Sequence, residues 1–144
     1  MTIAFTVYGE PVAQGRPRAS TRNTGKRKIV MHDPQKSKDF KHYVALVASQ
    51  HKPNQLITGP VSMDIRVFRP MTKKISDSKK QKACAEKGIL RPTTKPDVDN
   101  YSKGIKDALN NLIYKDDSQV VELKICKFYS ENPRVEIIIT ELMN

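Results

Sequence analysis

The stretch KPDVDNYSKGIKDALNNLIYKDDSQVVE, from Lys95 to Glu122, contains the strongest helix pattern in the chain and decides its fold. Its apolar residues recur at intervals of three and four, which places them on one stripe of a helix: Tyr101, Ile105, Ala108, Leu109 and Leu112. The spacing predicts a helix from about Asp99 to Ile113, with that stripe packed against a sheet. Two small clusters of aspartates flank the helix, although the chain as a whole is strongly basic.

Outward from this helix, alternating apolar residues predict four strands. They fall at residues 2–8, 61–68, 121–125 and 135–139, and the SENP turn favours an antiparallel hairpin of the last two. Asp33 and Pro34 form a good helix start, which predicts an amphipathic helix over residues 34–51.

The two remaining segments lack a clear apolar face. Residues 72–88 predict either a weak surface helix ending at Gly88 or a segment that orders on binding, and residues 9–33 predict a long loop or β-ribbon. The expected fold is α+β (mixed α/β): a single domain over residues 1–144 with a mixed four-stranded sheet, packed helices and the order β-α-β-α-α-β-β.

The charge of the chain points to a polyanionic partner. It has 26 Lys and Arg against 15 Asp and Glu, a formal net charge of +11 and a pI near 9.7, so nucleic acid is the leading candidate. Fifteen of the basic residues lie in residues 14–33 and 69–95, stretches poor in core residues. The first candidates for DNA binding are Arg16, Arg18, Lys26, Arg27, Lys73 and Lys74. The alternative for each is ordinary solvated surface.

Several other classes of site are excluded by spacing. The chain has no P-loop and no EF-hand loop, so neither a nucleotide cofactor nor a calcium site of that kind is expected. Cys84 and Cys126 form no CxxC pair, and the three histidines have no zinc spacing. No apolar run suits a membrane span or signal peptide, which makes no membrane contact and a cytoplasmic location the default expectations.

The aspartate clusters predict a metal site. If the chain is extended through PDVDN, Asp97 and Asp99 point to the same side, because side chains alternate along extended chain. Lys103 then lies one helical turn beyond Asp99, and the DD pair, Asp116 and Asp117, could reach back from the start of the next strand. Carboxylate oxygens suit Mg²⁺ or Mn²⁺, which could act on a phosphodiester.

A plainer interpretation holds for any one aspartate taken alone. Asp is a preferred helix-cap and turn residue, and Asp107 is expected to be an acid on the helix surface or behind the metal ligands. A cap needs only one carboxylate, however, so the pair together with Lys103 favours the metal site.

The string from Lys95 to Glu122 closely resembles the signature of the RusA-type Holliday junction resolvases, D-x-D-N-x-x-K followed by D-A-L and D-D-x-Q-V. The segment GEPVAQGRPR is similar to phage and prophage members. The resemblance implies a homodimeric, Mg²⁺-dependent endonuclease that cuts four-way DNA junctions symmetrically, in recombination and repair. It places the metal-binding, catalytic aspartates on Asp97, Asp99 and Asp117, with Asp116 as the alternative to the third, and the catalytic lysine on Lys103.

Two rival functions stay open at this point. A non-catalytic architectural protein could use the same basic surface to bind DNA. A metal-dependent nuclease acting on RNA or on unbranched DNA would need the same acidic residues, and only the family resemblance argues against it.

Overall fold

The computed structural model describes the backbone of residues 1–15, 18–22, 28–32 and 35–143, and the side chains of residues 1–15 and 35–143. Four strands form the main sheet: β1 (Thr2–Tyr8), β4 (Val61–Pro70), β5 (Val120–Ser130) and β6 (Arg134–Glu141), in the order β1-β6-β4-β5. β6 runs antiparallel to both of its neighbours, and β5 runs parallel to β4. The sheet is therefore mixed, as predicted.

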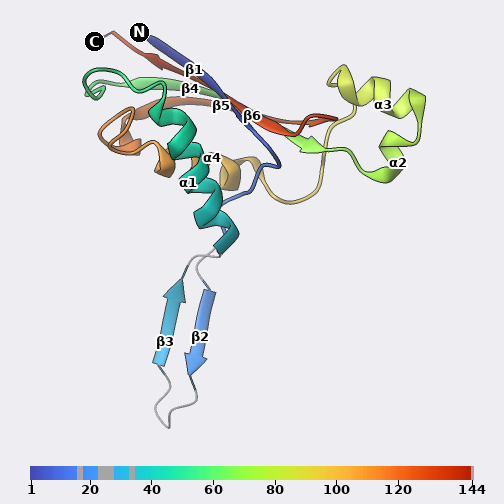
Figure 1. Ribbon diagram of the computed structural model, residues 1–144, viewed down its shortest axis with the longest axis horizontal. Coiled ribbons are helices and arrows are strands. Elements are labelled where there is room, and N and C mark those ends of the chain that lie inside the picture. The colour runs from blue at the N-terminus through green and yellow to red at the C-terminus, as the bar shows by residue number, and fades with distance from the viewer. Residues whose placement is uncertain (16–17, 23–27, 33–34, 144) are drawn as a thin grey trace.

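Two long helices pack on one side of this sheet (Figure 1). They are α1 (Gln35–Ser49) and α4 (Val98–Ala108), which also contact each other. Alternate residues of β1, β4 and β6 face them, and the resulting core is mostly aliphatic, with Phe and Tyr residues among its members. Its most deeply buried members include Val44, Ile65, Ile105, Leu109, Ile137 and Ile139. Burial of this apolar face is what holds α4, and the aspartates around it, in place.

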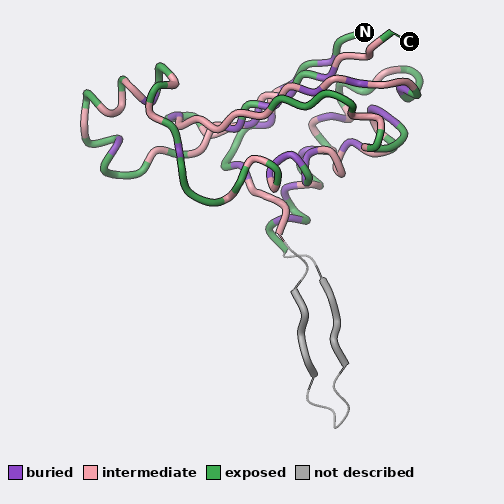
Figure 2. The backbone as a smooth tube through the Cα atoms, turned by 180° about the vertical axis from the view of Figure 1, so that it is seen from behind, coloured by how far each residue is buried: buried purple, intermediate pink, exposed green. Residues whose placement is uncertain are grey.

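The segment between β4 and α4 folds as two short helices, α2 (Lys73–Ser76) and α3 (Lys79–Glu86), at the far end of the sheet from the chain termini (Figure 1). Only Ile75 and Ala85 of these helices are buried, and Figure 2 shows the pair as mostly exposed or intermediate tube. The predicted surface helix over residues 72–88 is thus confirmed as helical but split at Asp77 and Ser78. Ser78 caps the second helix by accepting a hydrogen bond from the Gln81 N–H.

A separate two-stranded sheet accounts for part of the basic segment before α1. Its strands are β2 (Arg18–Arg22) and β3 (Lys28–His32), paired antiparallel. This confirms the β-ribbon of the two alternatives for residues 9–33. Figure 1 shows the pair beyond the N-terminal end of α1, away from the main sheet.

The helix predicted over residues 99–113 is shorter than its apolar stripe suggests. It ends at Ala108, and Leu109 to Ile113 continue as turns that keep Leu109 and Ile113 fully buried. Asn111 adopts a positive φ of 61°, a left-handed conformation that asparagine tolerates better than most residues. The two consecutive asparagines therefore end the helix while the stripe stays in the core.

The hairpin predicted from the SENP turn is wrong. β5 and β6 do not pair with each other, because β4 lies between them. Alternate residues of β4 and β6 are fully buried, whereas most of the first residues of β5 are exposed, so the two most deeply buried strands take the middle of the sheet. Residues 131–133 cross the end of β4, a step of about 10 Å that a few extended residues can span.

None of the described helices is long and apolar enough to cross a membrane.

Candidate active site

The first turn of α4 separates the two aspartates of the D-x-D motif. Asp97 is the N-cap residue, with extended φ and ψ of −73° and 158°, and the helix begins at Val98 rather than at Asp99 as predicted. Side chains two residues apart point to nearly opposite sides of a helix, whereas they share a side only in extended chain. The expectation that Asp97 and Asp99 point the same way is therefore corrected: each lines a different pocket.

Asp99 lines an open pocket of about 710 Å³ between α4 and the start of β5. Lys103 and Asp107 line the same pocket from the next two turns of α4, and Asp117 lines it from the short 3₁₀ helix η1 (Asp117–Gln119). Lys103 is exposed and Asp117 is half-buried. Lys106 also lines this pocket, so three carboxylates and two ammonium groups share a single concave surface. Asp117 comes from a segment at least ten residues away from the other two acids.

The two aspartates of the DD pair have different roles: Asp116 caps η1, whereas Asp117 lines the pocket. Asp116 caps η1: its Oδ2 accepts a hydrogen bond of 3.0 Å from the Ser118 N–H, while its own N–H donates to Gln119 Oε1 at 2.9 Å. Hydrogen bonding to Ser118 also lowers the pKa of the Asp116 carboxyl. Asp116 is exposed and does not line the pocket, so the geometry distinguishes it from Asp117.

Gln119 fixes η1 to the rest of the molecule. Its Nε2 donates to the Ile57 and Gly59 carbonyls at 2.7 and 2.9 Å, more than fifty residues away in sequence. The Q of D-D-x-Q-V therefore has a clear structural task, which is to hold the turn that presents Asp117. An amide is suited to this task because one NH₂ group can serve two carbonyls.

Asp107, which the sequence predicted to be an acid on the helix surface or behind the metal ligands, lines this pocket. The pKa of its carboxyl is raised, first by burial, then by a hydrogen bond with the Asp117 side chain and then by the negative charge of Asp117. The positive charges of Lys41 and Lys103 lower this pKa and so oppose the rise. Its spacing of four residues from Lys103 and eight from Asp99 puts all three on one stripe of the helix, which agrees with this position.

Tyr114 lies fully buried near the acidic residues. Its hydroxyl donates a hydrogen bond of 2.6 Å to the Lys106 carbonyl, which ties the turn after α4 back to the helix. Burial raises the pKa of its phenol, and the nearby charges of Asp117, Asp107 and Asp116 raise it further. No periodicity in the sequence had singled out this residue.

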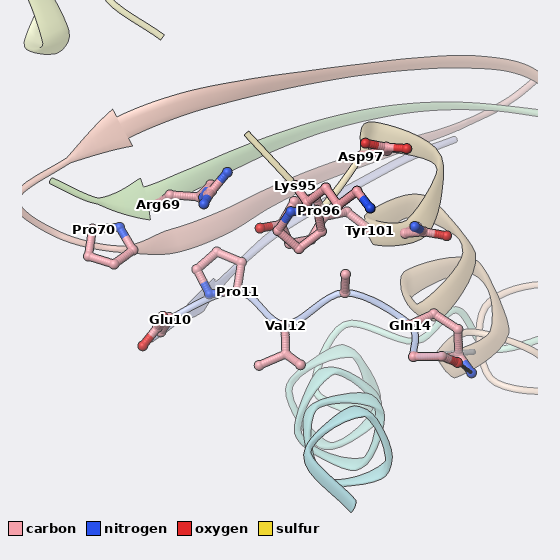
Figure 3. A pocket seen from close by; sticks show the side chains of 13 residues that line it. Glu10, Pro11, Val12, Gln14, Arg69, Pro70, Lys95, Pro96, Asp97 and Tyr101 are labelled. Atoms are coloured by element: carbon pink, nitrogen blue, oxygen red, sulfur yellow. Dashed lines mark hydrogen bonds between the residues drawn. The ribbon is translucent and has the colours of Figure 1, made fainter. Parts of the chain in front are cut away.

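Asp97 faces the other side of the α4 N-terminus. Figure 3 shows the pocket there, which has a volume of about 700 Å³ and is bounded by α4, the end of β4 and the segment after β1. Its charged lining residues are Glu10, Arg69, Lys95 and Asp97. The backbone beneath it is well anchored, because Arg69 Nη1 and Lys127 Nζ both donate hydrogen bonds of 3.0 Å to the Thr94 carbonyl.

The carboxylate oxygens that line this pocket are ligands that a hard divalent cation prefers. Asp107 and Asp117 are close enough to share a hydrogen bond, an arrangement of like charges that a cation would relieve. Within the described residues, however, no three His, Cys, Asp or Glu side chains lie close enough to hold a metal ion together. Mg²⁺ commonly binds through one or two protein carboxylates, with water and substrate phosphate completing its shell.

The segment that leads to the basic ribbon is fastened beside this site. The Gly15 N–H donates to Ser37 Oγ at 2.8 Å, Ser37 Oγ donates to the Ala13 carbonyl at 3.0 Å, and the Gln14 N–H donates to the Asn100 carbonyl at 2.9 Å. Ser37 is a buried residue of α1. Residues 13–15 are thus held between α1 and α4.

The residues predicted to bind DNA fall in different parts of the structure. Lys73 and Lys74 are exposed at the start of α2. Arg18 is the first residue of β2, and its side chain lies outside the described part of the chain, as do Arg16, Lys26 and Arg27 altogether.

Comparison with known proteins identifies the family. The family model "Endodeoxyribonuclease RusA" matches residues 8–140. The chain belongs to the RusA family of endodeoxyribonucleases. The family membership suggested by the motif is confirmed, and the nuclease class follows from it. The uncharacterised protein YqaN of Bacillus subtilis (strain 168) is 72% identical over 140 residues, covering 97% of this chain and 96% of YqaN.

A shorter match carries a functional name. A crossover junction endodeoxyribonuclease RusA of Lactococcus phage r1t is 45% identical over 51 residues, which cover 35% of this RusA-family chain and 39% of the phage protein.

Proposed function

We propose that this RusA-family nuclease is a metal-dependent resolvase that cuts four-way DNA junctions by paired, symmetric incisions. The observation that carries the proposal is the pocket in which Asp99, Lys103 and Asp117 come together from α4 and η1. The partial likeness to a phage crossover junction endodeoxyribonuclease supports a branched substrate.

Asp99 and Asp117 are the proposed ligands of Mg²⁺, for which Mn²⁺ would substitute, because both carboxylates line one pocket. When bound, the ion would neutralise charge on the scissile phosphate and activate the attacking water. Asp97, which the family motif makes the third metal-binding aspartate, lies across the helix N-terminus in the neighbouring pocket. We assign it to the same centre, with a change of its side-chain direction when DNA and metal bind.

The remaining pocket residues have distinct proposed roles. Lys103 is an exposed cation one turn from Asp99, where its ammonium group would bind a phosphate oxygen and stabilise charge that develops during cleavage. Asp107 contacts Asp117 and would orient it. Gln119 and Tyr114 act further away by fixing η1 and the turn after α4.

Binding of branched DNA is assigned to the basic residues of segments 14–33 and 69–95. Residues 69–95 carry exposed lysines, among them Lys73 and Lys74, and the ribbon segment starts from residues held next to α4. If about six phosphates are neutralised, log K falls with log salt at a slope of about −5. A homodimer would give the two-fold symmetry that paired cuts in a symmetric junction require.

The test is cleavage of a labelled synthetic four-way junction, beside a matched linear duplex, in Mg²⁺ and in EDTA. Paired nicks in the junction, with metal alone and not in Asp117→Asn, are expected. Binding that is equal in EDTA and Mg²⁺, without a nick in Mg²⁺ or Mn²⁺, would instead support a non-catalytic architectural protein. Equal cleavage of the linear duplex would contradict junction selectivity while leaving the nuclease assignment intact.

A further inference from the structure

A third cavity, of about 630 Å³, lies in the α2–α3 region, and none of its lining residues lines the acidic pocket. Its floor is apolar and includes Ile75, which is buried, and Leu90 and Tyr129, which are half-buried. Ile89 also lines it and is 72% exposed. The cavity is thus large enough for a ligand of nucleotide size, and its apolar floor is not sealed by the protein's own side chains.

The rim of this cavity is cationic. Lys74 of α2, Lys80 of α3 and Arg91 line it, and no Asp or Glu of the described chain does so. Arg91 is fixed in place, because its Nε donates a hydrogen bond of 2.8 Å to the Gly88 carbonyl and its guanidinium lies 4.4 Å from the centre of the Phe128 ring. An apolar floor under a cationic rim complements a base with its phosphate.

The cavity is joined to the acidic site through a short length of chain. Arg91 and Thr93 line the α2–α3 cavity, while Lys95 and Asp97 line the pocket at the N-terminus of α4. The carbonyl of Thr94, between them, is held by hydrogen bonds from Arg69 and Lys127. Cationic side chains therefore continue from the α2–α3 cavity to Asp97, a path that a DNA strand could follow.

We propose that the α2–α3 cavity binds an unstacked nucleotide of the DNA strand that runs through the acidic site. The base packs on Ile75, Leu90 and the Tyr129 ring, and the flanking phosphates contact Lys74 and Lys80. A base within a duplex cannot enter a cavity, so this site selects DNA that is single-stranded or opened at a branch. The role in junction cleavage rests on the proposed function, but the nucleotide site itself does not.

Neighbouring lysines supply a matched control. Lys73 and Lys79 are exposed next to Lys74 and Lys80 but do not line the cavity. Affinity for a single-stranded oligothymidylate would be measured in EDTA for the double variants Lys74→Ala/Lys80→Ala and Lys73→Ala/Lys79→Ala. Both lose the same charge, so a general electrostatic effect weakens them equally. The lining pair is expected to bind about tenfold more weakly than the control pair; equal affinities would overturn the site.

The base itself is tested by removing it. Wild-type protein is expected to bind the oligothymidylate about five- to tenfold more tightly than the same oligonucleotide carrying abasic sites, because stacking is lost. Tyr129→Leu, which keeps an apolar side chain in place of the ring, is expected to lose most of this preference. Absence of any preference in the wild-type protein would overturn the proposal.

These measurements use neither metal nor a junction, so they do not depend on catalysis. A protein that never cuts junctions but discriminates the matched lysine pairs would refute the proposed function and retain the nucleotide site. Normal junction cleavage by the Lys74→Ala/Lys80→Ala variant, together with an affinity equal to that of the control variant, would refute the nucleotide site and leave the proposed function intact.

Discussion

The α4–η1 region and the α2–α3 region are held to the protein in contrasting ways. α4 buries an apolar stripe in the core, and η1 is fixed through hydrogen bonds from its cap and from Gln119. The α2–α3 region buries only Ile75 and Ala85. Its other links include the Lys82–Glu131 ion pair, a hydrogen bond from the Glu131 N–H to Glu86 Oε1 and the packing of Arg91 on Phe128. The first region carries the acidic residues and the second carries an excess of basic ones.

This contrast follows from what each region is proposed to do. Chemistry on a phosphate requires groups placed to within fractions of an ångström, so its residues need a rigid support. Phosphate binding by lysines requires positive charge but not precise placement, because the ammonium group sits on a flexible stem. Four experiments test whether the two regions differ in this way.

The largest effect is expected from Asp117→Asn in η1. Loss of this carboxylate should lower junction cleavage on the order of 10³-fold, while affinity measured in EDTA stays close to wild type. Asp116→Asn is the matched control, since Asp116 caps η1 and does not line the pocket; it should cleave within a few-fold of wild type. If the control variant lost activity and Asp117→Asn kept it, the two roles would be reversed.

Substitution of a buried residue should lower the free energy of unfolding more in α4 than in α2. Ile105→Ala removes a fully buried side chain from α4 and should lower the free energy of unfolding by about 3–4 kcal/mol, because it leaves a cavity in the main core. Ile75→Ala in α2 should cost less than about 2 kcal/mol, since its surroundings can collapse. Urea unfolding measures both, and equal losses would mean that α2 and α3 belong to the same cooperative unit as α4.

Ser37→Ala tests the anchor of the segment before the ribbon. The serine makes two hydrogen bonds from a buried position, to the Gly15 N–H and the Ala13 carbonyl. Its loss should lower the free energy of unfolding by about 1–2 kcal/mol. Ser76→Ala in α2, which removes one exposed hydrogen bond, should stay within about 0.5 kcal/mol of wild type. A larger effect at Ser76 would contradict the weaker attachment of α2.

The smallest effect is a pH dependence from Asp107. Its folded-state pKa is raised by burial and by Asp117, so the folded protein binds this proton more tightly than the unfolded chain does. That contribution is present below the ordinary carboxyl pKa and is lost as the pH rises through the raised one.

Asp107→Asn removes this titration. Compared with the variant, metal-free wild type should therefore lose stability as the pH increases from about 4 towards neutrality. Urea midpoints in EDTA across that range measure the difference. Parallel curves for wild type and variant would show that Asp107 titrates normally.

Local patterns sufficed for most elements, because a helix or strand depends on residues close in sequence. The stripe on α4 and the alternation in β4 and β6 are of this kind. Strand pairing was not predictable in the same way: the SENP turn favours a hairpin, but the deeper burial of β4 and β6 determines which strands are neighbours.

The residues of the site show the same difference between features that local sequence predicts and features that depend on distant residues. The grouping of Asp99 and Lys103 followed from helical spacing, and Asp117 joined them as the family motif implied. The separation of Asp97 from Asp99 depended on the helix starting at Val98, one residue earlier than expected. For Asp107 the sequence left two positions open, on the helix surface or behind the metal ligands, because its partner Asp117 is ten residues away and is brought to it only by the turn after α4.

The position of β6 between β1 and β4 has a consequence for synthesis. β1 is synthesised before the other strands of the main sheet, yet its hydrogen-bonded neighbour is β6, the last of the four in sequence, so β1 must wait unpaired until about 130 further residues have followed. The main sheet is therefore completed only after β6 has been made, and a nascent chain stopped before Arg134 would leave β1 without its partner.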